Sequence, residues 1–118
     1  MGGLIALQRG GIYLARLDPA KGAEIGKLRP VIVLTDQHLL NIEPAHIFIT
    51  PLSRRSNEAY ASMHVALPAR DNLHVQSFAL VEHCRAISIK RIQSERLAQL
   101  HSGELGEIVH RLQRLIGL

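Results

Sequence analysis

The sequence predicts a β-dominated α+β fold, a small antiparallel barrel or sandwich of about five or six strands capped by a C-terminal helix. Over the first two thirds of the chain, β-branched and apolar residues come in short runs bounded by Gly, Pro, Asp and Asn, which is typical of strands. After Ser102 the hydrophobic period becomes that of a helix. Since 118 residues suit one core, we expect residues 1–118 to form a single domain.

The first two strands are expected over residues 11–17 and 29–35. Asp18-Pro19 ends the first strand, because proline removes a ladder donor and restricts the residue before it. A glycine-bearing loop over 20–28 leads into the second strand. Four consecutive apolar residues in that strand indicate a central position with both faces covered.

Further elements follow in the order of the chain. Asp36 is expected to cap a short helical turn that ends at Asn41. Strands are expected over 45–52, 63–67, 77–81 and 86–89, with a polar loop over 53–62. Ser102 is the expected N-cap of a helix of about four turns. Its apolar stripe consists of Leu105, Ile108, Val109, Leu112, Leu115 and Ile116.

The charge balance is compatible with a polyanionic partner. The chain has 14 Lys and Arg against 10 Asp and Glu, a net charge of +4 and a pI of about 9.8. Cys84 is the only cysteine, and none of the seven histidines has a ligand-like spacing, so we expect no metal and no cofactor. No signal peptide or membrane-spanning run is visible, which predicts a cytoplasmic protein with no membrane partner.

The segment from Asp18 to Pro30 holds the densest group of candidate site residues. Its glycines carry a carboxylate, Glu24, and a guanidinium, Arg29, on a loop between two strands. Loops on a rigid sheet often hold functional sites. The spacing alone favours a turn with an exposed ion pair over a functional site.

With these residues in view, the chain resembles the MazF/PemK family of toxin endoribonucleases. The resemblance runs through nearly the whole chain in the family's order. It rests on residues 9–13 (RGGIY), 17–34 (LDPAKGAEIGKLRPVIVL), 49–52 (ITPL), 64–65 (HV), 80–87 (LVEHCRAI) and the amphipathic C-terminal helix.

This resemblance implies an SH3-like barrel of the plasmid-toxin type, a homodimer, an acidic antitoxin partner, and metal-independent cleavage of single-stranded mRNA at short sequences. It places Arg29 and Thr50 at the scissile phosphate. The RNA 2′-hydroxyl would attack the phosphorus, which leaves 2′,3′-cyclic phosphate and 5′-hydroxyl ends. Glu24 would either orient Arg29 or transfer a proton. The general base stays open between Glu24, Glu82 and His64.

Seven further residues are candidates for RNA contact. Tyr13 is the first choice for a base-stacking ring, with a core or interface tyrosine as the alternative, and Phe48 and Phe78 are expected in the core. Arg54 and Arg55 would hold phosphates or serve as solubility charges. Glu82 and Arg85 would contact RNA, hold the dimer or form a buried pair. The full set of RNA-contact candidates is Tyr13, Lys27, Ser53, Arg54, Arg55, Glu82 and Arg85.

Two other functions remain compatible with the sequence. A toxin of the same fold could bind a protein target such as DNA gyrase, although that role does not need Arg29 and Thr50 together. A catalytically degenerate member could bind RNA or its antitoxin without cleavage. Leu14 and His83, which stand where the family usually has an aromatic residue and glutamine, make that alternative conceivable.

Overall fold

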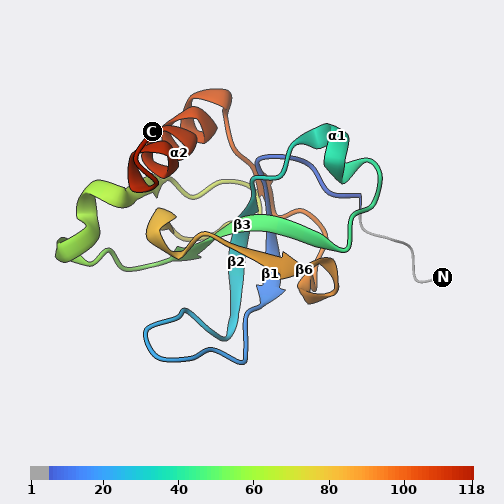
Figure 1. Cartoon of the computed structure of the whole chain (residues 1–118), viewed down its shortest axis with the longest axis horizontal. Coiled ribbons are helices and arrows are strands. Elements are labelled where there is room, and N and C mark those ends of the chain that lie inside the picture. Colours follow the sequence, from blue (N-terminus) through green and yellow to red (C-terminus); the bar gives the residue numbers. More distant parts are fainter. Residues whose placement is uncertain (1–5) are drawn as a thin grey trace.

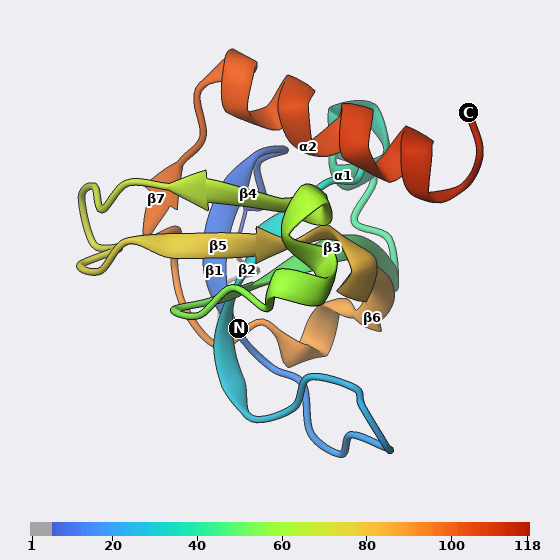
Figure 2. The same ribbon diagram turned by 90° about the vertical axis from the view of Figure 1, so that its left-hand side faces the viewer.

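A computed structural model describes residues 6–118 and confirms the predicted β-dominated class. One curled antiparallel sheet forms the body, and a C-terminal helix lies across one of its sides (Figures 1 and 2). The strand order is β4-β5-β3-β2-β1-β7, and β6 also pairs with β3. The strands are β1 (Gly11–Arg16), β2 (Leu28–Val33), β3 (His46–Ser53), β4 (His64–Leu67), β5 (Ser77–Leu80), β6 (Arg85–Ser88) and β7 (Ala98–Gln99).

Strand β3 divides one of its edges between two partners. Along one edge it pairs with β2, where Thr50 lies opposite Ile32. On the other edge, residues 46–49 pair with β6, whereas Leu52 and Ser53 pair with β5. Thr50 therefore lies between these two pairings, beside residues 81–84, which connect β5 to β6.

Strand β2 is central and covered on both faces, as predicted. Val31, Ile32 and Val33 have no exposed surface. Because successive side chains of a strand point to opposite faces, Ile32 joins one core cluster while Val31 and Val33 join the other. Each cluster buries about a dozen residues, so the sheet is stabilised from both sides.

Helix α1 (Gln37–Leu40) confirms the predicted capped turn. The Asp36 carboxylate accepts a hydrogen bond from the His38 N–H at 3.0 Å, and Asn41 is the C-cap. A side chain that satisfies an otherwise unpaired N–H at the start of a helix is the usual reason for aspartate at this position.

Helix α2 (Ser102–Leu115) begins one residue earlier than predicted, because Ser102 is its first residue and not its N-cap. Its N-cap is His101, not Ser102, because Glu104 accepts a hydrogen bond from the His101 N–H at 2.9 Å. Ile108 is fully buried against the sheet, whereas Leu115 and Ile116 at the end of the predicted stripe are 44% and 63% exposed. Only the first part of the stripe therefore packs on the sheet.

Several short elements of the structure are not predicted by the sequence. The expected loop over 53–62 contains the 3-10 helix η1 (Glu58–Met63), and the two-residue strand β7 was not expected. Two further 3-10 helices, η2 (Val81–His83) and η3 (Ile89–Arg91), flank β6. Elements this short show no hydrophobic periodicity.

The turn over residues 70–73 is tied to α2. Arg70 and Leu73 exchange backbone hydrogen bonds, and the Arg70 guanidinium holds both carboxylate oxygens of Glu104. This ion pair lowers the pKa of Glu104.

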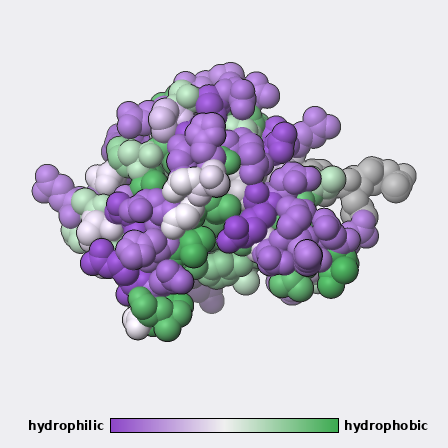
Figure 3. All heavy atoms as spheres, turned by 90° about the horizontal axis from the view of Figure 1, so that it is seen from above, coloured by the Kyte–Doolittle hydropathy of each residue, from purple (hydrophilic) through white to green (hydrophobic). Residues whose placement is uncertain are grey.

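The surface seen from above is largely hydrophilic, with apolar side chains in separate groups (Figure 3). Within residues 6–118, no helix is long and apolar enough to cross a bilayer.

Candidate nucleic-acid interface

The loop between β1 and β2 is held at its base by its own polar groups. Leu17 donates its N–H to the Lys27 carbonyl at 2.8 Å, and Asp18 Oδ1 accepts from the Lys27 N–H at 2.7 Å. A Cβ on Gly26 would stand 2.5 Å from Asp18 Oδ1, so a side chain there would break this closure. The contacts fix the start of β2, where Arg29 lies.

Arg29 is half-buried, and a backbone carbonyl fixes its orientation. Its Nε donates to the Gly26 carbonyl at 2.9 Å, while its two terminal nitrogens make no hydrogen bond within residues 6–118. The Glu24 carboxylate accepts from the Lys21 N–H at 2.7 Å, and no ion pair joins it to Arg29 among the described residues. Gly26, rather than Glu24, therefore orients the guanidinium.

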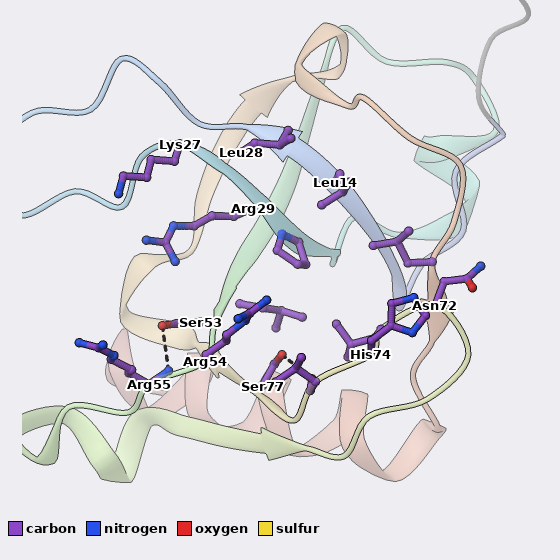
Figure 4. A pocket seen from close by; sticks show the side chains of 15 residues that line it. Leu14, Lys27, Leu28, Arg29, Ser53, Arg54, Arg55, Asn72, His74 and Ser77 are labelled. Atoms are coloured by element: carbon purple, nitrogen blue, oxygen red, sulfur yellow. Dashed lines mark hydrogen bonds between the residues drawn. The ribbon is translucent and has the colours of Figure 1, made fainter.

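A cleft of about 730 Å³, here called the main cleft, brings together five of the predicted site residues. Its lining includes apolar residues, among them Leu14, Pro30 and Leu52. No acidic residue is among its lining in the part of the chain that the structure describes, so its cations act without a compensating charge. Figure 4 shows the five predicted residues along one side of it: Lys27, Arg29, Ser53, Arg54 and Arg55.

The opposite side of the main cleft carries polar groups that sequence reasoning missed. Asn72 and His74 are exposed there, and Figure 4 shows them across the cleft from Arg29. The Asn72 N–H donates to the Leu97 carbonyl at 3.0 Å, which anchors this segment. In the sequence no motif distinguished these two residues.

A second cleft adjoins the main cleft, and a third adjoins the second. Ser53 and Arg55 line both the main cleft and a second cleft of about 680 Å³, whose lining includes Tyr60 and His64. A third cleft of about 170 Å³ contains the remaining charged candidates Glu24, Glu82 and Arg85. The charged site candidates thus form two groups, cations in the main cleft and mixed charges in the third cleft, and Glu82 lines the second cleft as well.

Thr50 lines none of these three clefts. It has no exposed surface, and its hydroxyl donates to the Leu80 carbonyl at 3.0 Å. This bond ties β3 to the end of β5, at the divided edge of the sheet. A hydroxyl so placed holds the segment that carries Glu82, which directly follows Leu80 and Val81.

The structure corrects the placement of two aromatic residues. Tyr13 is fully buried, its hydroxyl accepts from the Gln8 N–H at 2.9 Å, and burial raises its pKa. A ring without exposed surface offers no face to a base, so the core alternative for Tyr13 fits this geometry. Phe48, expected in the core, is instead 36% exposed. Tyr13 is buried because its ring is part of the core cluster that also contains Val31 and Val33.

Glu82 belongs to a network that its sequence position did not indicate. Its Oε2 lies 2.7 Å from His64 Nε2, and His64 Nδ1 lies 2.7 Å from the Ser56 hydroxyl. No ion pair joins Glu82 to Arg85 among the described residues; Glu82 Oε1 and Arg85 Nη1 are both buried without a hydrogen-bond partner. The expected buried pair of Glu82 is therefore made with His64.

The Cys84 thiol is expected to react slowly in the folded protein. Burial raises its pKa from 9.0 to about 11, so only about one thiol in a thousand is ionised at pH 8. We expect alkylation by iodoacetamide at pH 8 to be at least about 100-fold slower than in urea-unfolded protein, and to rise steeply towards pH 11. Mass spectrometry over time measures it; equal rates in both states would contradict the assigned environment.

The fold and these clefts define a small curled-sheet protein with an open, basic binding surface suited to a polyanion. Among residues 6–118, no group of three or more His, Cys, Asp or Glu side chains is arranged to hold a metal ion. A family model matches residues 8–116, and the chain belongs to that family, the PemK-like, MazF-like toxins of type II toxin-antitoxin systems.

Solved structures agree with this assignment. The chain is similar to MazF from Deinococcus radiodurans, with 25% identity, a TM-score of 0.82, and coverage of 96% of this chain and 98% of that one. It is also similar to the MazE-MazF complex of that organism, with 25% identity, a TM-score of 0.75, and coverage of 96% and 97%. An endoribonuclease from mycobacterial species, 15% identical, shares the fold with a TM-score of 0.74 and coverage of 98% and 95%.

Proposed function

We propose that the protein is a metal-independent endoribonuclease that cuts single-stranded mRNA at short sequences, and that its main cleft receives the RNA. The observation that carries the proposal is the Arg29 guanidinium, fixed through Nε and with both terminal nitrogens free of hydrogen bonds at the side of a cleft without acidic lining. A forked cation of this kind binds two phosphate oxygens at once.

The proposed reaction uses the substrate's own nucleophile. The RNA 2′-hydroxyl gives its proton to a general base, for which Glu24, Glu82 and His64 are the candidates, as its oxygen attacks the adjacent phosphorus. The bond from phosphorus to the 5′-oxygen breaks and that oxygen takes up a proton, which gives a 2′,3′-cyclic phosphate and a 5′-hydroxyl. Negative charge increases on the non-bridging oxygens during the attack, and Arg29 stabilises that charge. Lys27, Arg54 and Arg55 hold the neighbouring phosphates. Thr50 contributes by positioning the segment that carries Glu82, through its bond to Leu80.

An antitoxin partner follows from the same surface. The relative from Deinococcus radiodurans forms a MazE-MazF complex, and an endoribonuclease of mycobacterial species is described in complex with its cognate antitoxin. We infer that an acidic antitoxin segment covers the main cleft of this chain, because carboxylates there meet four cations without an acidic neighbour. We further propose a homodimer acting in the cytoplasm, where mRNA is available.

The test is cleavage of a long single-stranded RNA by the purified, antitoxin-free protein in excess EDTA. We expect cuts at one short sequence whose products carry 5′-hydroxyl and 2′,3′-cyclic phosphate ends. The same sequence as DNA should stay intact, because it lacks the 2′-hydroxyl. If folded protein leaves RNA intact, or if EDTA abolishes the cuts, the proposed reaction is wrong.

A further inference from the structure

Tyr60 is the exposed aromatic residue of the clefts. It lines the second cleft and is 51% exposed, whereas Tyr13 is buried and neither phenylalanine lines any of the three clefts described above. The exposed faces of aromatic rings are where unpaired bases stack in proteins that bind single strands. A protein whose main cleft has aliphatic rather than aromatic apolar residues in its lining needs such a ring elsewhere if bases are to be held by stacking.

The backbone around Tyr60 is held at both ends. At the start of η1, Asn57 accepts a hydrogen bond on its side chain from the Ala59 N–H at 2.9 Å and on its carbonyl from the Tyr60 N–H at 3.0 Å. At its end, Arg111 of α2 donates to the carbonyls of Ser62 at 2.6 Å and His64 at 3.0 Å. A ring on a fixed backbone loses little further freedom on binding.

The second cleft continues the main one. Ser53 and Arg55 line both, so an RNA strand held at Arg29 passes Arg55 on its way to Tyr60. Ile25, from the loop between β1 and β2, also lines the second cleft and supplies apolar surface to it. The second cleft thus combines a cation for a phosphate, an aromatic ring for a base and an apolar side chain, the groups that a single strand needs.

We propose that the Tyr60 ring stacks on an unpaired base of the nucleic-acid strand, and that Arg55 holds a phosphate beside it. The proposal rests on the proposed function for the identity of the strand. It adds a binding subsite outside the main cleft and away from the scissile phosphate. Loss of the ring then weakens binding without removing any charge.

The experiment measures binding of a fluorescein-labelled 20-nucleotide single-stranded DNA, which carries phosphates and bases but no 2′-hydroxyl nucleophile. We expect Tyr60→Ala to weaken binding about 5- to 150-fold, with an unchanged salt dependence, and Tyr60→Phe to bind like the wild type. Phe48→Ala is the matched control, since Phe48 is a partly exposed aromatic outside the clefts, and it should bind normally.

Tyr60→Trp provides a second readout that does not depend on loss of binding. The chain contains no tryptophan, so this variant has a single one, whose emission should be quenched as the DNA saturates. Wild-type affinity of Tyr60→Ala, or unchanged Tyr60→Trp emission at saturating DNA, would overturn the proposal. If DNA quenches the Tyr60→Trp emission but the wild-type protein never cuts RNA, the subsite is supported and the proposed ribonuclease function is wrong. Cleavage with normal Tyr60→Ala binding would reject the subsite alone.

Discussion

Replacing Arg29 with alanine is expected to slow RNA cleavage at least about 100- to 1,000-fold while the protein stays folded. Removal of one preoriented donor to a developing oxyanion commonly costs that much, and the guanidinium offers two. The fold should tolerate the change, because Arg29 lies at the start of β2, half-buried, and its one hydrogen bond is to a loop carbonyl. Quantitative mapping of 5′-hydroxyl ends in EDTA measures the rate.

Two controls separate chemistry from general charge. Arg29→Lys keeps the charge but loses the forked geometry and the Nε bond to Gly26, so we expect it to remain strongly impaired. Arg54→Ala removes an exposed cation of the same cleft and should chiefly weaken binding and reduce the salt dependence. If Arg29→Ala cleaved at the wild-type rate, the main cleft would not be the reaction site.

Thr50→Val is expected to lower the free energy of unfolding by about 1–3 kcal/mol and to slow cleavage as well. Valine has nearly the same shape, but it leaves the Leu80 carbonyl without its hydroxyl donor in a fully buried position. The segment from Leu80 to Arg85 carries Glu82 and Cys84, so its displacement disturbs two clefts at once. Urea denaturation and the cleavage assay measure the two effects.

The comparison with Thr50→Ser tests the positioning role. Serine restores the hydroxyl and should recover most of both stability and cleavage. A Thr50→Val protein with wild-type stability and no cleavage would instead place the hydroxyl on the substrate in a conformation different from this one. Unchanged stability together with unchanged cleavage would remove Thr50 from the site altogether.

The sequence predicted those parts of the fold that local chemistry decides. Asp36 caps α1 because a carboxylate satisfies a helix N–H within two residues, and the apolar run before Thr35 forms the central strand β2 because both of its faces must be buried. The shift of the helix N-cap from Ser102 to His101 depends on Glu104, whose carboxylate is shared with Arg70, more than thirty residues away in the chain. A partner so distant in the chain as Arg70 leaves no pattern in the sequence around the helix start.

The sequence predicted the cations of the candidate site but not which of its side chains are exposed to solvent. The charges of Lys27, Arg29, Arg54 and Arg55 are evident from the sequence, and the structure collects them in the main cleft. Whether a side chain is reached by solvent depends on long-range packing, however. Thr50 and Tyr13 both lie in strands and both have no exposed surface, while Tyr60 in the expected loop lies open.

The bonds from Arg111 give α2 a role beyond covering the sheet. Arg111 also pairs with Glu107 at 2.9 Å, so its guanidinium is oriented by its own helix while it grips the backbone that follows Tyr60. An event that lifts this helix, such as a truncation or a partner that displaces it, would break both bonds and free the backbone that follows Tyr60. For the subsite proposed at Tyr60, binding of the nucleic acid would therefore depend on a helix that need not touch it.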